Sequence, residues 1–204
     1  MTLISRKASL WICGLGMVQL LFATGLTVCG FIVMGLYRVL DCKGIWAGLP
    51  MMVPALLSVV VLGTRHRAAG IAAILTGIIV LIFSAYHVVV VWEDIDFWEK
   101  YKEYAESNVD PRPCYNRGDQ CICADLTDYL ASGYTVPRCD LFRTGYELFW
   151  TLIGLTIGGI LFTILTLILT IWGCFTAKHV ATEEDSLDGS IKKPPQYENE
   201  GLEY

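Results

Sequence analysis

Four long blocks of apolar residues dominate the chain, and none of them contains aspartate, glutamate, lysine or arginine. The blocks are Ala8 to Leu36, Ile45 to Thr64, Ala68 to Trp92 and Leu148 to Ala177. An α-helix rises about 1.5 Å per residue, so about 20 residues cross a hydrocarbon layer about 30 Å thick. Each block is long enough to do so, and none has the polar face of a helix on a soluble protein. The pattern predicts an all-α membrane protein, a bundle of four transmembrane helices.

The bounds of these blocks divide the chain into spans and connecting segments. The transmembrane helices are predicted at residues 8–37, 45–64, 68–92 and 146–175. The remaining segments are predicted to be an N-terminus at 1–7, short loops at 38–44 and 65–67, a large loop at 93–145 and a disordered tail at 176–204. Disorder is expected in the tail because it is polar and acidic, with too few apolar residues to form a core.

The composition agrees with this pattern. Of 204 residues, 54% are hydrophobic and 17% are charged, and the mean hydropathy is +0.52. An ordinary soluble domain has about 25% charged residues. The formal net charge of −5 gives no basis for nucleic-acid binding. Membrane lipid and other membrane proteins are therefore the expected surroundings.

Basic residues predict the orientation of the spans. They occur before the first block, between the second and third, and after the fourth: Arg6, Lys7, Arg65, Arg67 and Lys178. Short cytosolic segments of multi-pass proteins are enriched in lysine and arginine. Both termini are therefore predicted to be cytosolic, and the loops at 38–44 and 93–145 are predicted to lie outside the cell.

Four cysteines lie in the predicted large loop: Cys114, Cys121, Cys123 and Cys139. The outside of the cell is oxidising, so these residues are expected to form disulfides. The two cysteines of a Cys-x-Cys step rarely bridge each other, so the outer two are expected to pair with the central two, in either order. Cys42 makes the number outside odd. It is predicted to be free, to bridge to another chain or to displace one of the four.

The large loop is predicted to begin with a helix that continues the third span from Glu93 to Ser107. Its aromatic residues recur at helical spacing on one face: Phe97, Trp98, Tyr101 and Tyr104. Two prolines, Pro111 and Pro113, end the helix. Two interpretations of this face are open: it packs on the rest of the loop, or it is a docking surface for a partner.

A short motif, Arg117-Gly118-Asp119, lies between Cys114 and Cys121. Some integrin ligands present a cation and a carboxylate on a disulfide-constrained turn of this sequence. Glycine and aspartate are also what any tight turn favours, and a three-residue match arises easily by chance. The plain turn is the simpler interpretation, and integrin recognition is the alternative.

Polar side chains are rare inside the predicted spans. We interpret Gln19 as an interhelical hydrogen-bonding group and His87 as an interfacial histidine, rather than as parts of an ion path. Gly154 and Gly158 form a Gly-x-x-x-Gly step, which lets helices approach closely within the bundle or against another protein. No catalytic set, metal-ligand spacing or phosphate-binding glycine loop occurs in the sequence. We therefore expect no enzyme, and no metal or cofactor.

Two short motifs lie in the predicted tail. Pro194-Pro195-Gln196-Tyr197 is a Pro-Pro-x-Tyr element of the kind that WW domains bind through an aromatic groove. The last residues, Leu202-Glu203-Tyr204, could add to the sheet edge of a PDZ domain. A cytosolic WW- or PDZ-domain partner is therefore predicted, and a solvated tail with two incidental tyrosines is the alternative.

The spans contain the segments Gln19-Leu20, Gly25-Leu26-Thr27-Val28, Gly30-Phe31 and Trp46-Ala47-Gly48. The loop contains a particular cysteine spacing: Cys114, six residues, Cys121-Ile122-Cys123, and Cys139 beside Asp140. In these segments the chain resembles the sarcospan-like family of four-span membrane proteins, and the resemblance covers roughly residues 8–174. The family is related to the B-cell four-span antigens and is similar to tetraspanins, whose Cys-Cys-Gly signature does not occur in this sequence.

The resemblance implies a non-enzymatic scaffold of the plasma membrane. The family belongs to the dystrophin–glycoprotein complex of muscle membranes. The bundle is then expected to pack laterally against sarcoglycan- or dystroglycan-like glycoproteins, with the cysteine loop on their outer domains, and to stabilise a link between cytoskeleton and matrix. Two alternatives belong to other classes: a channel-modulating subunit, and a trafficking adaptor that recruits WW-domain ubiquitin ligases.

Overall fold

In a computed structural model, the protein is described over residues 4–37, 43–107, 114–118, 120–123 and 136–191, with side chains through Ala177 in the last range. The elements in chain order are α1 (Arg6–Tyr37), α2 (Ile45–Thr64), α3 (Arg67–Glu106), β1 (Cys114–Arg117), β2 (Gln120–Cys123) and α5 (Leu141–Ile191). Several residues singled out by the sequence lie outside the described residues: Cys42, Asp119, Pro194, Pro195, Tyr197 and the final Leu202-Glu203-Tyr204.

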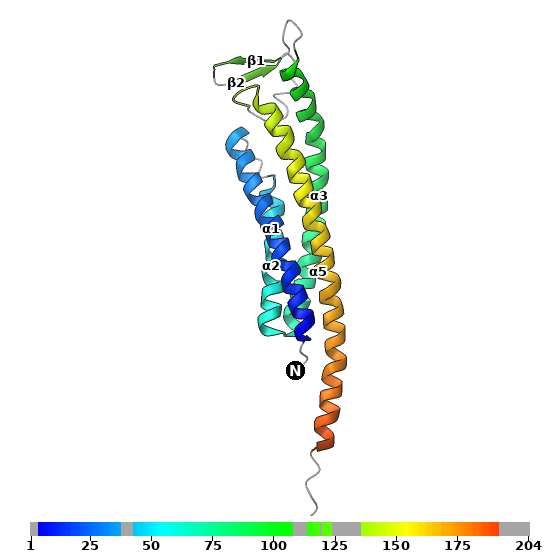
Figure 1. The fold of residues 1–204 in the computed structure, drawn as a ribbon. Helices are drawn as coiled ribbons and strands as arrows, with labels where there is room; N and C mark the ends of the chain where they lie inside the picture. The colour runs from blue at the N-terminus through cyan, green and yellow to red at the C-terminus, as the bar shows by residue number, and fades with distance from the viewer. Residues whose placement is uncertain (1–3, 38–42, 108–113, 119, 124–135, 192–204) are drawn as a thin grey trace, which may run out of the picture.

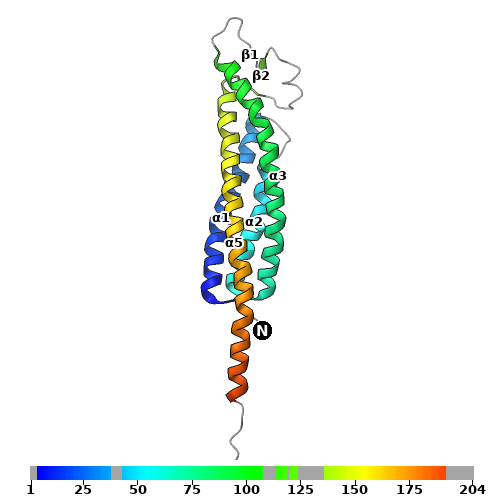
Figure 2. The same ribbon diagram turned by 90° about the vertical axis from the view of Figure 1, so that its right-hand side faces the viewer.

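The long helices form an elongated antiparallel bundle (Figures 1 and 2). α1 packs against α2 and α5, and α3 packs against the same two helices, so the order around the bundle is α1, α2, α3, α5. At one end α3 and α5 reach past α1 and lie beside the β1–β2 hairpin (Figure 1). We call the described residues 93–107, 114–118, 120–123 and 136–149 the head. The opposite end, where α2 is joined to α3, is the base.

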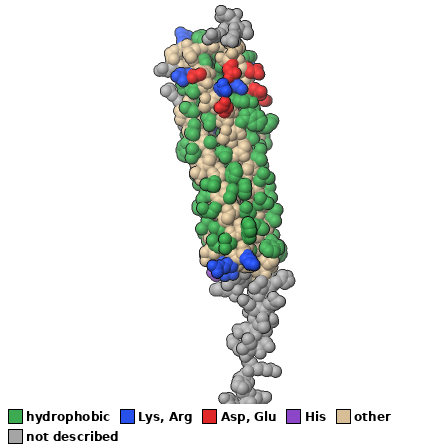
Figure 3. Space-filling model, in the orientation of Figure 1, with side chains coloured by type: hydrophobic (Ala, Val, Ile, Leu, Met, Phe, Trp, Pro, Cys, Tyr) green, Lys and Arg blue, Asp and Glu red, His purple; other side chains and the backbone are tan. Residues whose placement is uncertain are grey.

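The surface of the bundle between head and base is apolar. Figure 3 shows hydrophobic side chains along the length of the helices, with charged side chains gathered near the two ends. Large apolar residues such as Leu21 (73% exposed) and Ile82 (67%) point outward from the bundle. An apolar surface of this extent marks a site of contact with lipid or protein. Four helices of the described chain are long and apolar enough to cross a membrane, in agreement with the predicted number of four.

The helix ends differ from the predicted bounds at α5. This helix begins at Leu141 rather than at residue 146, and one of its first turns carries an Arg143–Glu147 pair, with Nε and Oε1 3.3 Å apart. It then continues to Ile191, beyond the predicted end of the fourth span at residue 175. Alanine, glutamate and leucine in this segment favour helix, and extending an existing helix needs no new nucleation.

Two glycines let α1 and α2 pack at close range. A Cβ atom on Gly16 of α1 would collide with the side chain of Ser58 on α2 and lie 3.2 Å from the carbonyl oxygen of Ala55. A Cβ on Gly48 of α2 would lie 2.8 Å from the carbonyl oxygen of Ala23. Small residues at such points allow close backbone approach and good dispersion contacts between apolar helices.

Replacing Gly16 with valine is expected to destabilise the bundle by about 1–3 kcal/mol, because the added carbons overpack the α1–α2 interface. Gly14→Val provides a matched control on the same helix, since a Cβ there meets nothing within 4 Å. The apparent melting temperature of each variant in mild detergent checks this expectation. Equal melting temperatures for the two variants would contradict the close approach at Gly16.

Candidate interaction site: the disulfide-closed head

The hairpin in the head is closed by one disulfide and tied to α5 by another. Cys114 of β1 pairs with Cys123 of β2, and Cys121 of β2 pairs with Cys139, just before α5. The structure thus confirms that the outer cysteines pair with the central two, and it selects one of the two predicted orders. The sulfurs of the first three cysteines lie within 4.8 Å of one another. Each is in a disulfide, so none offers the thiolate that a metal requires.

Hydrogen bonds fix the hairpin on the start of α5. The strands are antiparallel, with Cys114 opposite Cys123 and Asn116 opposite Cys121. The Cys121 amide donates to the carbonyl of Val136, 2.9 Å away. The Asn116 side-chain oxygen accepts from the amide of Cys139, also at 2.9 Å. The hairpin is therefore held by hydrogen bonds to the segment before α5 as well as by its disulfides.

An aromatic cluster joins the head to the helices. Trp98 of α3 is completely buried, and its ring centroid lies 4.7 Å from that of Tyr37, 5.2 Å from Phe149 and 5.8 Å from Phe142. The Tyr37 hydroxyl donates to the carbonyl of Leu141 at 3.0 Å, which links the end of α1 to the start of α5. This cluster makes the head continuous with the core of the bundle.

The burial of this cluster corrects one prediction. Trp98 and Tyr101 are 0% and 1% exposed, so they cannot be contact residues for a partner. Phe97 and Tyr104 are half-buried and pack against the same core. The packing interpretation of the aromatic face is therefore confirmed, and the docking interpretation is wrong for its two central residues. The sequence does contain a signal for the apolar face of α5 that packs on them. Phe142 and Phe149 are seven residues apart and therefore lie on one helical face.

Part of the exposed surface of the head lies on the hairpin. Tyr115 is 52% exposed, and Arg117 is exposed beside the turn. Gly118 has φ of 60°, a backbone conformation that glycine adopts without steric cost. The turn by itself therefore accounts for a glycine at position 118. Of the Arg-Gly-Asp motif, the described side chain that is exposed to a partner is that of Arg117.

His87 connects three helices at the head end of the bundle. Its Nε2 accepts a hydrogen bond from the amide of Gly44 at 3.0 Å, and its Nδ1 lies 3.1 Å from the Thr156 hydroxyl. That hydroxyl donates to the carbonyl of Leu152 at 2.7 Å. Nδ1 must therefore carry the ring proton and donate it to Thr156. Both ring nitrogens of this buried histidine are used in joining the start of α2 to α3 and α5.

His87→Leu is expected to destabilise the protein by about 1–3 kcal/mol, because the buried Gly44 amide then loses its acceptor. A lower apparent melting temperature in detergent is the readout. His66→Leu is the control, since His66 is exposed at the base. Equal melting temperatures for the two leucine variants would contradict the bridging role.

Gln19 links α1 to α2 within the bundle. Its Nε2 donates to the carbonyl of Met51, 3.3 Å away, and the side chain is fully buried. This confirms its interpretation as an interhelical hydrogen-bonding group. Such a bond is worth about 1 kcal/mol between membrane helices.

The two glycines of the Gly-x-x-x-Gly step have different surroundings. A Cβ on Gly158 would lie 3.0 Å from Cδ1 of the Phe22 ring on α1. Gly158 therefore serves packing within the bundle, which is one of the two predicted roles of this step, and its contact with a partner stays a prediction. Gly154 is exposed, and a Cβ there would meet nothing within 4 Å. Gly154 thus leaves open space on the surface of α5 for a neighbouring molecule.

The fold and the head together define a four-helix bundle of membrane-spanning length that carries a disulfide-closed module at one end. A scan against protein-family models and a search of the curated proteins found no match to this chain. The sarcospan-like resemblance therefore stays a prediction from the sequence.

Proposed function

We propose that the protein is a non-enzymatic scaffold of the plasma membrane, with four spans, both termini in the cytosol and the head outside. Its partners are single-span glycoproteins of the sarcoglycan or dystroglycan type, as in a dystrophin–glycoprotein complex. The observation that carries this proposal is the head itself. Two disulfides and a buried aromatic cluster fix it rigidly on an apolar bundle. A rigid module can hold an assembly together without paying the ordering entropy of a flexible loop.

Charge and redox chemistry support the orientation. The two disulfides are at the head end, which suits an oxidising compartment. Arg65 and Arg67 lie at the base, where α2 meets α3, and basic residues favour the cytosolic side. The side chain of Arg65 also donates to the carbonyl of Ile4 at 3.0 Å, which places the N-terminal segment at the same end.

The interior of the bundle supports a scaffold rather than an ion path. Its described buried polar groups are Gln19, His87 and several serines and threonines, with no carboxylate or ammonium group among them. Thr156, Thr163 and Thr170 each donate to a carbonyl one turn earlier in α5. Ion and proton paths in membranes are usually marked by ionisable residues. These threonines are instead satisfied within α5, while Gln19 and His87 form hydrogen bonds between helices.

Two surfaces are offered to a partner. The hairpin presents Tyr115 and Arg117 on the head, and tyrosine and arginine are residue types enriched at binding hot spots. Within the apolar part, the notch at Gly154 lets a partner's transmembrane helix approach the backbone of α5. Together these surfaces fit a single-span glycoprotein that contacts both the bundle and the head.

Affinity purification of the tagged full-length chain from native membranes in mild detergent tests this function. The expected result is recovery of sarcoglycan- or dystroglycan-like glycoproteins, identified by mass spectrometry. Gly154→Ile should lower their recovery about fivefold or more at unchanged melting temperature, since it fills the notch. Gly14→Ile, at another open position, should leave recovery unchanged. An energy of about 1 kcal/mol from close helix packing corresponds to a change of this size.

Other outcomes would overturn the scaffold proposal. Recovery of WW-domain ubiquitin ligases alone, lost in Tyr197→Ala, would identify a trafficking adaptor. A channel subunit as the dominant partner would identify a channel-modulating protein.

A further inference from the structure

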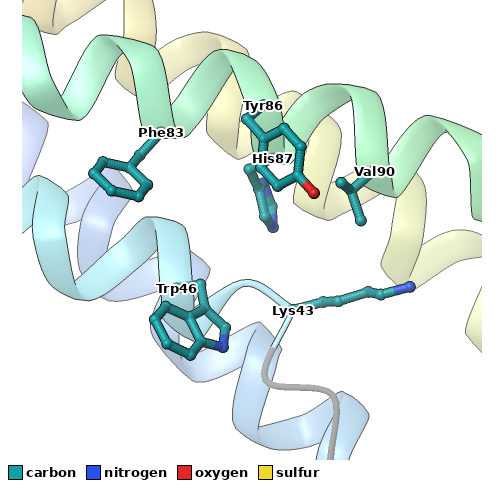
Figure 4. A pocket seen from close by; sticks show the side chains of 6 residues that line it. All are labelled: Lys43, Trp46, Phe83, Tyr86, His87 and Val90. Atoms are coloured by element: carbon teal, nitrogen blue, oxygen red, sulfur yellow. The ribbon is translucent and has the colours of Figure 1, made fainter.

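A cavity of about 280 Å³ opens on the side of the bundle between α2 and α3, near the head. Its lining residues come from the start of α2 and from one face of α3: Lys43, Trp46, Phe83, Tyr86, His87 and Val90 (Figure 4). The four residues on α3 recur at spacings of three, four and seven, which places them on one helical face. The cavity is therefore part of the apolar surface of the bundle and faces the surrounding lipid in the proposed arrangement.

One end of the cavity is apolar and flat-sided. Trp46 and Phe83 lie on opposite sides of the gap in Figure 4, and they are 69% and 52% exposed. Their rings offer two flat faces that a linear acyl chain covers poorly. A rigid fused-ring body covers them well and loses little conformational freedom on binding. The apolar end thus favours a ring-shaped lipid.

The other end is polar, and an ion pair of the described residues balances its charge. Lys43 forms an ion pair with Asp94, and the two side chains are only 12% and 19% exposed. The hydroxyl of Tyr86 lies on the same side of the cavity as Lys43 in Figure 4. A phosphate headgroup binds best where cations exceed carboxylates, and here the ammonium is matched by a carboxylate. An uncharged hydroxyl, which both donates and accepts hydrogen bonds, is the complementary head.

The depth of the cavity also fits such a molecule. The lining residues on α3 run from Phe83 to Val90, seven residues along one continuous helix, which span about 10 Å. Half of a hydrocarbon layer is about 15 Å thick. The cavity therefore covers about two thirds of the depth of the leaflet next to the head.

We propose that this cavity binds a membrane sterol, with the hydroxyl at Lys43 and Tyr86 and the ring system between Trp46 and Phe83. The proposal rests on the membrane insertion proposed above, but it is independent of the glycoprotein partners. The occupant comes from the leaflet next to the head. A cavity of this volume encloses part of the sterol, and the remainder lies against the lipid-facing side of α3.

Cross-linking of a photoreactive cholesterol to the purified full-length chain in phosphatidylcholine nanodiscs tests the proposal. The expected result is label on peptides that contain residues 43–51 or 83–90. Phe83→Ala should lower labelling about tenfold, the effect of losing a well-buried ring contact. Phe175→Ala is the control, because this phenylalanine is 68% exposed near the base and should leave labelling unchanged.

Tyr86→Phe keeps the ring and removes only the hydroxyl, so it covers the case in which Phe83→Ala does not fold. It should lower labelling about fivefold, as expected for one lost hydrogen bond. Equal labelling of wild type and Tyr86→Phe, or displacement of the probe by added phosphatidylserine but not by cholesterol, would overturn the sterol assignment. Sterol labelling without glycoprotein partners would overturn only the scaffold function, and the reverse result would overturn only the sterol site.

Discussion

Replacing Trp98 with alanine is expected to destabilise the protein by about 3–5 kcal/mol, the usual cost of removing a large aromatic side chain from a core. Trp98 is completely buried where α1, α3 and α5 meet. Its ring packs on Tyr37 and Phe149, with centroids 4.7 and 5.2 Å away. Gly145 gives it room, since a Cβ there would lie 2.9 Å from Cη2 of the indole.

The apparent melting temperature in detergent, followed by gel filtration after heating, measures this effect. Trp11→Ala is the matched control, because Trp11 is 70% exposed on the apolar surface of α1. The head should also lose protection of its backbone amides from hydrogen exchange in Trp98→Ala, since the cluster joins the head to the bundle. A melting temperature that falls equally in both variants would contradict the central position of Trp98.

The double variant Cys121→Ser with Cys139→Ser is expected to lose about 3 kcal/mol of stability, the value for a loop of this size in the chain-entropy account. This disulfide joins residues 18 apart and ties the hairpin to the start of α5. The hydrogen bonds from Cys121 to Val136 and from Cys139 to Asn116 are then the remaining ties. They involve backbone groups that the substitution leaves in place, so the hairpin should loosen rather than detach.

The melting temperature under non-reducing conditions measures the loss. Each single serine variant should match the double variant, because either change removes the same bond. Cys13→Ser is the control, since Cys13 is a free cysteine in α1. A single variant as stable as the wild type would contradict this disulfide. A double variant clearly less stable than either single variant would favour the other order of pairing, in which Cys121 and Cys139 belong to different disulfides.

The main features of the fold could be predicted from local sequence. Charge-free runs of membrane length identify α1, α2 and α3 because crossing a hydrocarbon layer imposes length and apolarity directly. The extension of α3 to Glu106 also follows from local spacing of its aromatic residues. These features need no knowledge of which elements meet in space.

The features that could not be predicted depend on contacts between distant segments. The order of disulfide pairing follows from the register of the hairpin, in which Cys114 lies opposite Cys123. Packing of the aromatic face was predicted but its partners were not: Phe142 and Phe149 reach Trp98 from α5, more than forty residues later in the chain. Likewise, Gly158 is covered by Phe22 of α1, which no spacing within α5 indicates.

The continuation of α5 to Ile191 shows a limit of compositional reasoning. Acidic and polar residues after residue 177 predict disorder when they are considered alone. They follow a long helix without a proline or glycine to end it until Gly189, so the helix propagates through them. Local composition cannot describe this influence of the preceding segment.

Glycosylation mapping tests the central claim, a four-span protein with its head outside the cell and its tail in the cytosol. The sequence contains no Asn-x-Ser or Asn-x-Thr acceptor of its own. Asp125→Asn completes an acceptor with Thr127 in the segment between β2 and α5, and Asp188→Asn completes one with Ser190 near the C-terminus. Because both changes are Asp→Asn, each variant is the control for the other.

Each variant is expressed in mammalian cells and compared by mobility before and after treatment with a glycosidase. The account predicts that Asp125→Asn gains a glycan and that Asp188→Asn does not. A glycan on Asp188→Asn, or none on Asp125→Asn, would contradict the orientation and with it the proposed function of the head.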